Sequence, residues 1–133
     1  MTTDAETTTA SPSTFTTTTE PKNKVENKAQ CDKYPDTLMG RVIPNTTLEI
    51  EWDQIHNEIS DGLEAGGCWA PTDCEPRAKT AIIVPYKDRE LHLKRLLYYL
   101  HPFLRRQQIA YCIFVAEQFH EGRFNKGILM NAG

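Results

Sequence analysis

The sequence lacks several features that would assign it to a common class of protein. Its 133 residues carry 15 Lys and Arg against 18 Asp and Glu, and the resulting charge of −3 excludes a generally basic nucleic-acid binder. No apolar run approaches the ~18 residues of a membrane-spanning helix. The first residues have neither the basic nor the apolar region of a signal peptide. Four cysteines are too few for a scaffold held by disulfides alone, but enough for one or two bridges.

Apolar residues are nearly absent from residues 1–30, where Thr dominates the first twenty positions. Such a segment buries too little apolar surface to offset a backbone entropy cost of about 1–2 kcal/mol per residue, so we expect it to be disordered. Tracts rich in Thr, Ser and Pro are typical of O-glycosylated stalks in secreted proteins, and a plain unmodified leader is the alternative. The part expected to fold is then residues 31–133.

Residues 31–79 are predicted to be rich in loops. An N-x-T acceptor sequence for N-linked glycosylation begins at Asn45, and this short motif gives limited support to a lumenal or extracellular setting. Apolar residues at steps of three and four predict one amphipathic helix with a packing role, which is broken by two consecutive glycines. The residues of this stripe are Trp52, Ile55, Ile59 and Leu63.

The strongest pattern in the chain predicts a β-α-β unit. The apolar runs 80–85 and 110–116 are typical of strands buried on both faces, as in a parallel sheet. Between them, apolar residues mark one face of a helix, with Asp88 as its expected N-cap and Pro102 as an expected kink or break. The run 124–131 predicts the start of another helix. Together these elements indicate a doubly wound α/β fold.

Ligands of doubly wound sheets bind beyond the carboxyl ends of the strands. The loop from Pro85 to Arg89 lies at such an end, and its aromatic ring and two cations ahead of a helix N-terminus suit a nucleoside diphosphate. Between Glu75 and Gln108 there are eight Lys and Arg against three Asp and Glu, although the whole chain is negative. A solvated basic helix face is the alternative explanation of this local charge.

Seven motifs follow one another between the P-T-D-C turn and the end of the chain: P-T-D-C, AIIVPY, K-D-R, HLKRLLYYLHP, R-Q-Q, YCIFVAEQ and F-N-K. With this order and density, residues 66–133 resemble the β1,4-galactosyltransferase family of animals. The resemblance covers about half the chain closely and extends more weakly back to Cys31.

The resemblance implies a particular fold, activity and location. The fold would be the N-terminal part of a Rossmann-like GT-A catalytic domain, preceded by a stem. Members of the family are type II Golgi membrane proteins that transfer galactose, or in some relatives N-acetylgalactosamine or glucose, from a UDP-sugar to a terminal sugar, usually N-acetylglucosamine. They invert the anomeric centre and use Mn²⁺. The implied partners are UDP-galactose or UDP-N-acetylgalactosamine and a glycan acceptor, with no nucleic acid and with a membrane anchor that is not in this chain.

By the same resemblance, two elements contact the UDP-sugar. Their residues are Pro85, Tyr86, Lys87, Asp88 and Arg89 in the first, and Phe124, Asn125 and Lys126 in the second. The family usually has Arg in place of Lys87 and Lys126. Lys keeps the positive charge but loses the bidentate fork of the guanidinium group.

The cysteines also follow from the resemblance. In the family, a cysteine upstream of the core pairs with the one in the P-x-D-C turn, which implies a disulfide between Cys31 and Cys74 and an oxidising compartment. Four cysteines allow three pairings. Cys112 stands where the family usually has Gly, within a buried-strand pattern, so we expect it to be a buried thiol. Cys68 has no assigned role.

The family holds its Mn²⁺ with a D-x-D motif, and no D-x-D occurs in these 133 residues. The family's acceptor site and catalytic base lie further along the chain than the matched region, so we predict no catalytic or metal-binding residue here. The four histidines are expected on the surface or in packing: His56, His92, His101 and His120. Three hypotheses remain open: part of a galactosyltransferase, a short non-catalytic product that binds a UDP-sugar or a partner, and a fragment that does not fold alone.

Overall fold

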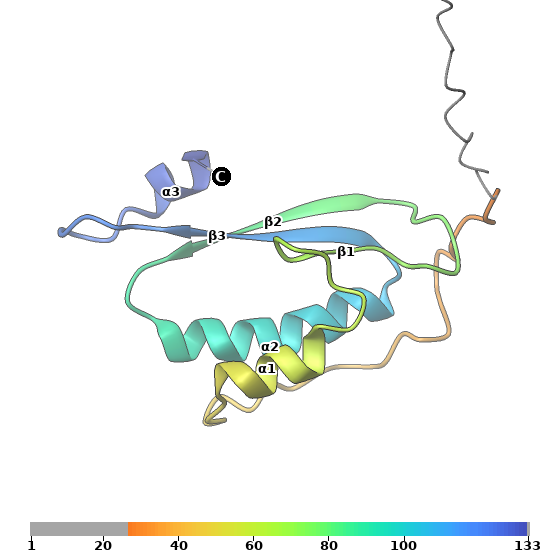
Figure 1. The fold of residues 1–133 in the computed structure, drawn as a ribbon, viewed down its shortest axis with the longest axis horizontal. Helices are drawn as coiled ribbons and strands as arrows, with labels where there is room; N and C mark the ends of the chain where they lie inside the picture. The colour runs from red at the N-terminus through yellow and green to blue at the C-terminus, as the bar shows by residue number, and fades with distance from the viewer. Residues whose placement is uncertain (1–26, 133) are drawn as a thin grey trace, which may run out of the picture.

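The computed structural model describes residues 27–132 as a mixed α/β structure (Figure 1). Most of the Thr-rich segment that is expected to be disordered lies outside these residues. The elements follow in the order α1 (Trp52–Ile59), β1 (Cys68–Trp69), β2 (Lys79–Tyr86), α2 (Glu90–Arg106), β3 (Ala110–Glu117) and α3 (Lys126–Ala132). Within the described residues, no helix is long and apolar enough to cross a membrane.

The sheet has three strands in the order β1-β3-β2. Strands β2 and β3 pair in parallel from Lys79 opposite Ala110 to Tyr86 opposite Glu117, which confirms the predicted β-α-β unit. Strand β1 pairs antiparallel with β3 and was not predicted, because two residues carry no periodic signal. Helices α1 and α2 lie on one side of the sheet and α3 lies on the other, beside the carboxyl ends of β2 and β3 (Figure 1).

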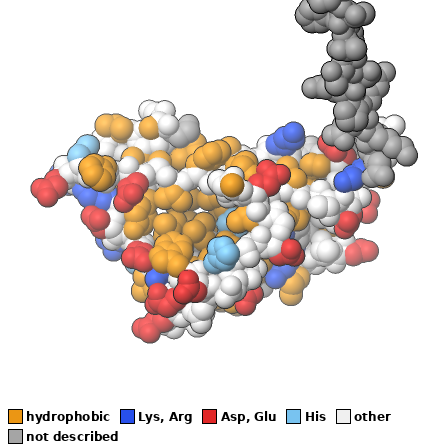
Figure 2. All heavy atoms as spheres, in the orientation of Figure 1, with side chains coloured by type: hydrophobic (Ala, Val, Ile, Leu, Met, Phe, Trp, Pro, Cys, Tyr) orange, Lys and Arg blue, Asp and Glu red, His pale blue; other side chains and the backbone are white. Residues whose placement is uncertain are grey.

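Two apolar clusters hold the helices in place. The first joins Ile55 and Ile59 of α1 to Ile50, and the second joins Leu104 of α2 to β3. Ile55 and Ile59 are one helical turn apart and therefore share a face, as the stripe predicts. Leu63 lies beyond the end of α1 but still packs against the first cluster. Figure 2 shows hydrophobic side chains gathered in the hollow between α1 and the strands, where a cavity of about 430 Å³ lies.

The prediction that both strands are buried on both faces is wrong for the described residues. Ile113 is buried among residues of α2, whereas its neighbour Phe114 points to the opposite face and is 47% exposed. Ala81 of β2 is also exposed. The apolar runs therefore belong to a sheet that carries α1 and α2 on one face, while α3 covers only one end of the other (Figure 1).

Helix α2 begins differently from the prediction, and it is not split at Pro102. Arg89 occupies the N-cap position without a side-chain hydrogen bond, and Asp88 lies one residue earlier in the left-handed region at φ 48°. Pro102 lies inside a helix that continues through it. An interior proline costs about 3 kcal/mol or more. Leu97 and Leu104, on either side of the proline, pack in the second cluster, and burial of such side chains offsets this cost at about 1.5–3 kcal/mol each.

The structure contains two disulfides. Cys31 is joined to Cys74, the pair that the family resemblance implies, with Cα atoms 4.9 Å apart. Cys112 is joined to Cys68, so the expectation of a buried thiol is wrong. The reason is strand β1, which places Cys68 directly opposite Cys112. The two bridges overlap along the sequence: one attaches the N-terminal segment to the turn after β1, and the other joins β1 to β3.

Candidate nucleotide-sugar site

The eight residues predicted to contact a UDP-sugar lie around the carboxyl ends of β2 and β3. The parallel ladder ends at Tyr86 and Glu117, and the backbone N–H of Gln118 donates to the carbonyl oxygen of Tyr86 at 2.9 Å. The loops that follow the two strands therefore start side by side. In an open α/β sheet this edge is where ligands bind.

Lys87 connects the two loops directly. Its ammonium group donates hydrogen bonds to the carbonyl oxygens of Gly122 at 2.6 Å and His120 at 3.4 Å. The sequence assigns this lysine to a phosphate, but in the structure it holds the loop after β3 against the loop after β2. Arg89 follows at the N-terminal end of α2, where the helix dipole favours anions.

Gln118 organises the second loop and is a residue that the sequence analysis missed. It is a buried polar residue at the end of β3. Its Oε1 accepts a hydrogen bond from the backbone N–H of Asn125 at 2.9 Å, and its Nε2 donates to the carbonyl oxygen of Arg123 at 3.2 Å. These two bonds fix Phe124, which lies between their partners and is half exposed. The available signals were its position directly after an apolar run and its place at the end of the motif YCIFVAEQ.

Asn125 caps the last helix. Its Oδ1 accepts a hydrogen bond from the N–H of Ile128 at 3.1 Å, so its side chain caps the N-terminal end of α3. Lys126 is the first residue of α3 and is exposed. A cavity of about 440 Å³ lies here, lined by residues between 117 and 129, and its lining does not include Pro85–Arg89. The two predicted elements are neighbours at one edge, and this cavity lies on the side of the second element.

Much of the local positive charge between Glu75 and Gln108 has a structural use. Four of its eight cations hold the segment before β1 on the rest of the fold. Their hydrogen bonds run from Arg77 to Cys31 O, from Lys94 to Glu51, from Arg95 to Leu48 O and from Arg105 to Ile59 O. The solvated-face alternative therefore fails for Lys94, Arg95 and Arg105, the three that lie on α2 and are not exposed. Lys87 and Arg89 remain at the edge of the sheet where a phosphate is expected.

Lys94 pairs with two carboxylates between α1 and α2. Its Nζ lies 2.9 Å from Glu51 and 3.2 Å from Glu90, and its side chain is 10% exposed. The hydrogen bond to Glu51 raises the pKa of Lys94. The indole N–H of Trp52, and then Lys94, lower the pKa of Glu90. This cluster connects α1 to the first turn of α2 and so positions Arg89.

His101 is a packing residue, as expected for the histidines. It is 3% exposed, and its Nδ1 lies 2.8 Å from the hydroxyl of Tyr111. Burial, and then the nearby charge of Arg105, lower the pKa of His101 to about 4. Burial raises the pKa of Tyr111. His101 is therefore neutral at physiological pH and takes no part in the edge site.

A manganese site does not fit the residues described. Residues 27–132 contain no cluster of three His, Cys, Asp or Glu side chains that could hold a metal ion. Hard divalent cations need several oxygen ligands, and the single carboxylate of the first loop, Asp88, has no such neighbours. We therefore assign no metal ligand and no metal-dependent step to these residues.

Comparison with known proteins identifies the family. Residues 31–133 match the model of the N-terminal region of glycosyl transferase group 7. The chain belongs to this family. It is 56% identical over 103 residues to bovine (Bos taurus) beta-1,4-galactosyltransferase 3, covering 77% of this chain and 26% of that protein. It is 56% identical over 76 residues to the rat (Rattus norvegicus) beta-1,4-galactosyltransferase 3, covering 57% of this chain and 19% of that protein.

The chain is also similar to a second type of beta-1,4-galactosyltransferase. Beta-1,4-galactosyltransferase 2 of Cricetulus griseus is 40% identical over 103 residues, which cover 77% of this chain and 28% of that protein. This member of glycosyl transferase group 7 thus spans between about a fifth and a quarter of the length of the curated relatives it matches. The matched region contains both elements of the edge site.

Proposed function

We propose that this chain is the nucleotide-sugar-binding part of an inverting β1,4-galactosyltransferase of the Golgi lumen. The donor is UDP-galactose or UDP-N-acetylgalactosamine, and the acceptor is a terminal N-acetylglucosamine or related sugar of a glycoprotein or glycolipid. The observation that carries the proposal is the match of residues 31–133 to the N-terminal region of the family, together with relatives named as beta-1,4-galactosyltransferases. Two disulfides support an oxidising compartment.

The edge of the sheet supplies groups suited to a uridine diphosphate. Tyr86 offers an aromatic ring for the base, and Arg89 offers a planar fork for two phosphate oxygens. The N-terminal end of α2 adds a partial positive charge next to Arg89. Phe124 is half exposed on the adjacent loop and offers a second apolar contact. In this proposal the residues bind and orient the donor, while the metal and the catalytic base of the family come from outside the matched region.

Donor binding tests the proposal most directly. UDP is titrated into the 133-residue chain by calorimetry, without added metal, and Arg89→Ala is compared with Arg106→Ala. Arg106 lies at the other end of α2, so this control removes the same charge away from the edge. We expect Arg89→Ala to weaken binding about tenfold, the effect of one lost charge-assisted hydrogen-bond pair, and Arg106→Ala to leave it unchanged. Equal effects of both variants, or a folded chain without affinity for UDP, would contradict it.

The second candidate is a short non-catalytic product that binds a UDP-sugar or a partner. It is favoured by an edge of the sheet that Lys87 and Gln118 already hold together within the described residues. Sequencing native transcripts beyond the codon for Gly133 separates the two. A reading frame that continues into a D-x-D motif supports the transferase. A stop codon directly after Gly133 in abundant transcripts supports the short product.

A further inference from the structure

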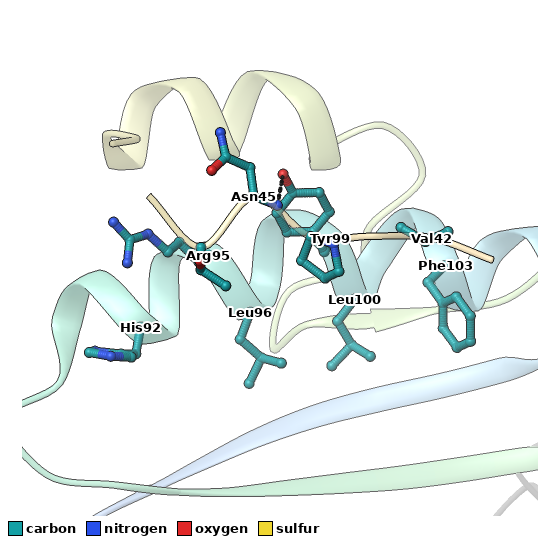
Figure 3. A pocket seen from close by; sticks show the side chains of 10 residues that line it. Val42, Asn45, His92, Arg95, Leu96, Tyr99, Leu100 and Phe103 are labelled. Carbon is teal, nitrogen blue, oxygen red and sulfur yellow. Dashed lines mark hydrogen bonds between the residues drawn. The ribbon is translucent and has the colours of Figure 1, made fainter. Parts of the chain in front are cut away.

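We propose that Asn45 carries an N-linked glycan, and that this glycan screens an apolar groove on the outer side of α2. The groove is defined by Val42, Leu96, Leu100 and Phe103, and it has a volume of about 520 Å³. Asn45 lies at its rim (Figure 3). The proposal does not depend on galactosyl transfer. It rests on the geometry of this site and on the oxidising compartment that the two disulfides require.

The acceptor sequence is held at the surface in an accessible form. The backbone N–H of Asn45 donates to the hydroxyl of Tyr99 at 3.0 Å, and the side chain of Arg95 donates to the carbonyl oxygen of Leu48 at 2.6 Å. These bonds attach the turn to α2 without covering it, because Asn45 and Thr47 are both exposed. It is also the only N-x-S/T sequence in the 133 residues.

The side chain of Asn45 is oriented for modification. Its Oδ1 accepts hydrogen bonds from the backbone N–H of Thr47 at 3.0 Å and from the Thr47 hydroxyl at 2.8 Å. Its Nδ2 is therefore directed away from the turn. Figure 3 shows the amide group pointing away from Leu96, Leu100 and Phe103. An attached glycan thus extends from the rim into solvent and leaves the floor of the groove unfilled.

The chemistry is a transfer from a lipid-linked oligosaccharide. A bond forms between Nδ2 of Asn45 and the anomeric carbon of the first N-acetylglucosamine, while the bond from that carbon to the pyrophosphate oxygen of the lipid breaks. The lipid pyrophosphate leaves with the bonding electrons, and Nδ2 loses one proton. The product is an uncharged, strongly hydrated group at the mouth of the groove.

The exposed groove indicates what effect a glycan on Asn45 would have. Leu96 is 41% exposed and Phe103 is 47% exposed, so an apolar surface faces solvent directly beside Asn45. Exposed apolar patches of this kind promote association. A hydrated glycan at the rim prevents a second copy of the chain from reaching the groove. In this proposal the glycan on Asn45 keeps the protein monomeric.

Expression of the chain in the secretory pathway of eukaryotic cells, behind a cleavable signal peptide, tests the modification. Treatment with peptide N-glycosidase should shift the mass and leave Asp at position 45 in the released peptide. Thr47→Ala should abolish the shift, whereas Thr46→Ala, which keeps the acceptor sequence, should retain it. An unmodified Asn45 peptide in the secreted Thr46→Ala and native chains would overturn the proposal, and this readout does not depend on how stably the variants fold.

Analytical sedimentation tests whether the glycan prevents the chain from associating through the groove. We expect Asn45→Gln to associate at concentrations at least about tenfold lower than the glycosylated chain, a difference of roughly 1.4 kcal/mol. Adding Phe103→Ser to this variant should restore the monomer, because it removes the exposed ring. Equal association of the glycosylated chain and Asn45→Gln would overturn the screening. Failure of UDP binding leaves both results unaffected, so this proposal and the proposed function can fail separately.

Discussion

The ammonium group of Lys87 donates a hydrogen bond to the carbonyl oxygen of Gly122, 2.6 Å away, and so connects the loop after β2 to the loop after β3. A second bond to the carbonyl of His120 strengthens the connection. The loop after β3 is further fixed by the buried Gln118. The edge of the sheet is therefore organised from both strands before any ligand is considered, which is the preorganisation that tight binding requires.

Removing the Lys87 side chain should loosen the loop that it holds. We expect amide hydrogens of residues 119–123 to exchange about tenfold faster in Lys87→Met, because a hydrogen bond to a charged group contributes about 1.5–3 kcal/mol. Lys87→Arg should retain most of the protection, since a guanidinium group also donates to carbonyl oxygens. Lys79→Met, at the opposite end of β2, is the matched control. Unchanged exchange in Lys87→Met would show that the loop is held by Gln118 alone.

Two neighbouring residues of β3 test whether the sheet has one covered face. Ile113→Ser should cost about 3 kcal/mol of unfolding free energy, because Ile113 is buried against α2. Phe114→Ser should cost less than about 1 kcal/mol and should reduce binding of a hydrophobic dye, because Phe114 is 47% exposed on the other face. Denaturant unfolding measures both. Similar losses for the two variants would mean that the second face is covered in solution.

The disulfides should contribute much of the stability of a chain of this size. Each bridge closes a loop of about 44 residues, for which the chain-entropy model gives about 4 kcal/mol. We expect Cys68→Ala/Cys112→Ala and Cys31→Ala/Cys74→Ala each to lower the unfolding free energy by roughly 2–4 kcal/mol. Peptide mapping without reduction should recover the pairs Cys31–Cys74 and Cys68–Cys112. Recovery of Cys31–Cys68 or Cys74–Cys112 would contradict the arrangement of β1.

The sequence predicted those elements that have a regular apolar pattern. Helix α2 and the Ile55–Ile59 stripe of α1 were visible from helical periodicity, and the parallel strands β2 and β3 from continuous apolar runs. Strand β1 was missed because it is two residues long, and with it the Cys68–Cys112 bridge, which depends on register across the sheet. Which strands pair, and in which register, depends on the tertiary structure, so a local sequence pattern does not predict it.

The sequence predicted which loops meet at this edge of the sheet, while their contact with a UDP-sugar stays a prediction. The family motifs and the end of a buried strand both indicated Pro85–Arg89, and the structure places this loop beside residues 118–125. Two side chains that were predicted to contact the ligand form hydrogen bonds with the protein's own backbone. Lys87 bonds two carbonyls, and Asn125 caps α3. The bonds of Lys87 join residues 33 and 35 positions apart, so residue type alone could not reveal them. The cap of Asn125 is local, and Asn is a preferred residue at this position of a helix.

His101 should make the stability of the protein depend on pH. Burial among α2 and β3 lowers its pKa in the folded state to about 4, compared with an ordinary value of 6.5, so the unfolded chain takes up this proton more readily. The stability that the neutral His101 contributes is fully present above pH 6.5, and it is lost as the pH falls from 6.5 toward 4. The linkage amounts to roughly 3 kcal/mol across this interval. The groups that face the imidazole are the Tyr111 hydroxyl and the Arg105 guanidinium.

Denaturant unfolding at pH 7.5 and pH 4.5 of the native chain, His101→Gln and His120→Gln separates His101 from other acid-sensitive groups. Glu90, whose pKa is lowered by Trp52 and Lys94, also loses stabilising interactions in acid, but it does so equally in all three proteins. Glutamine can still bond the hydroxyl of Tyr111 and does not titrate, so His101→Gln should lose markedly less stability on acidification than the native chain. His120 is exposed, and its replacement should leave the pH dependence unchanged. Parallel losses in the native chain and His101→Gln would mean that the imidazole can be protonated without leaving its place between α2 and β3.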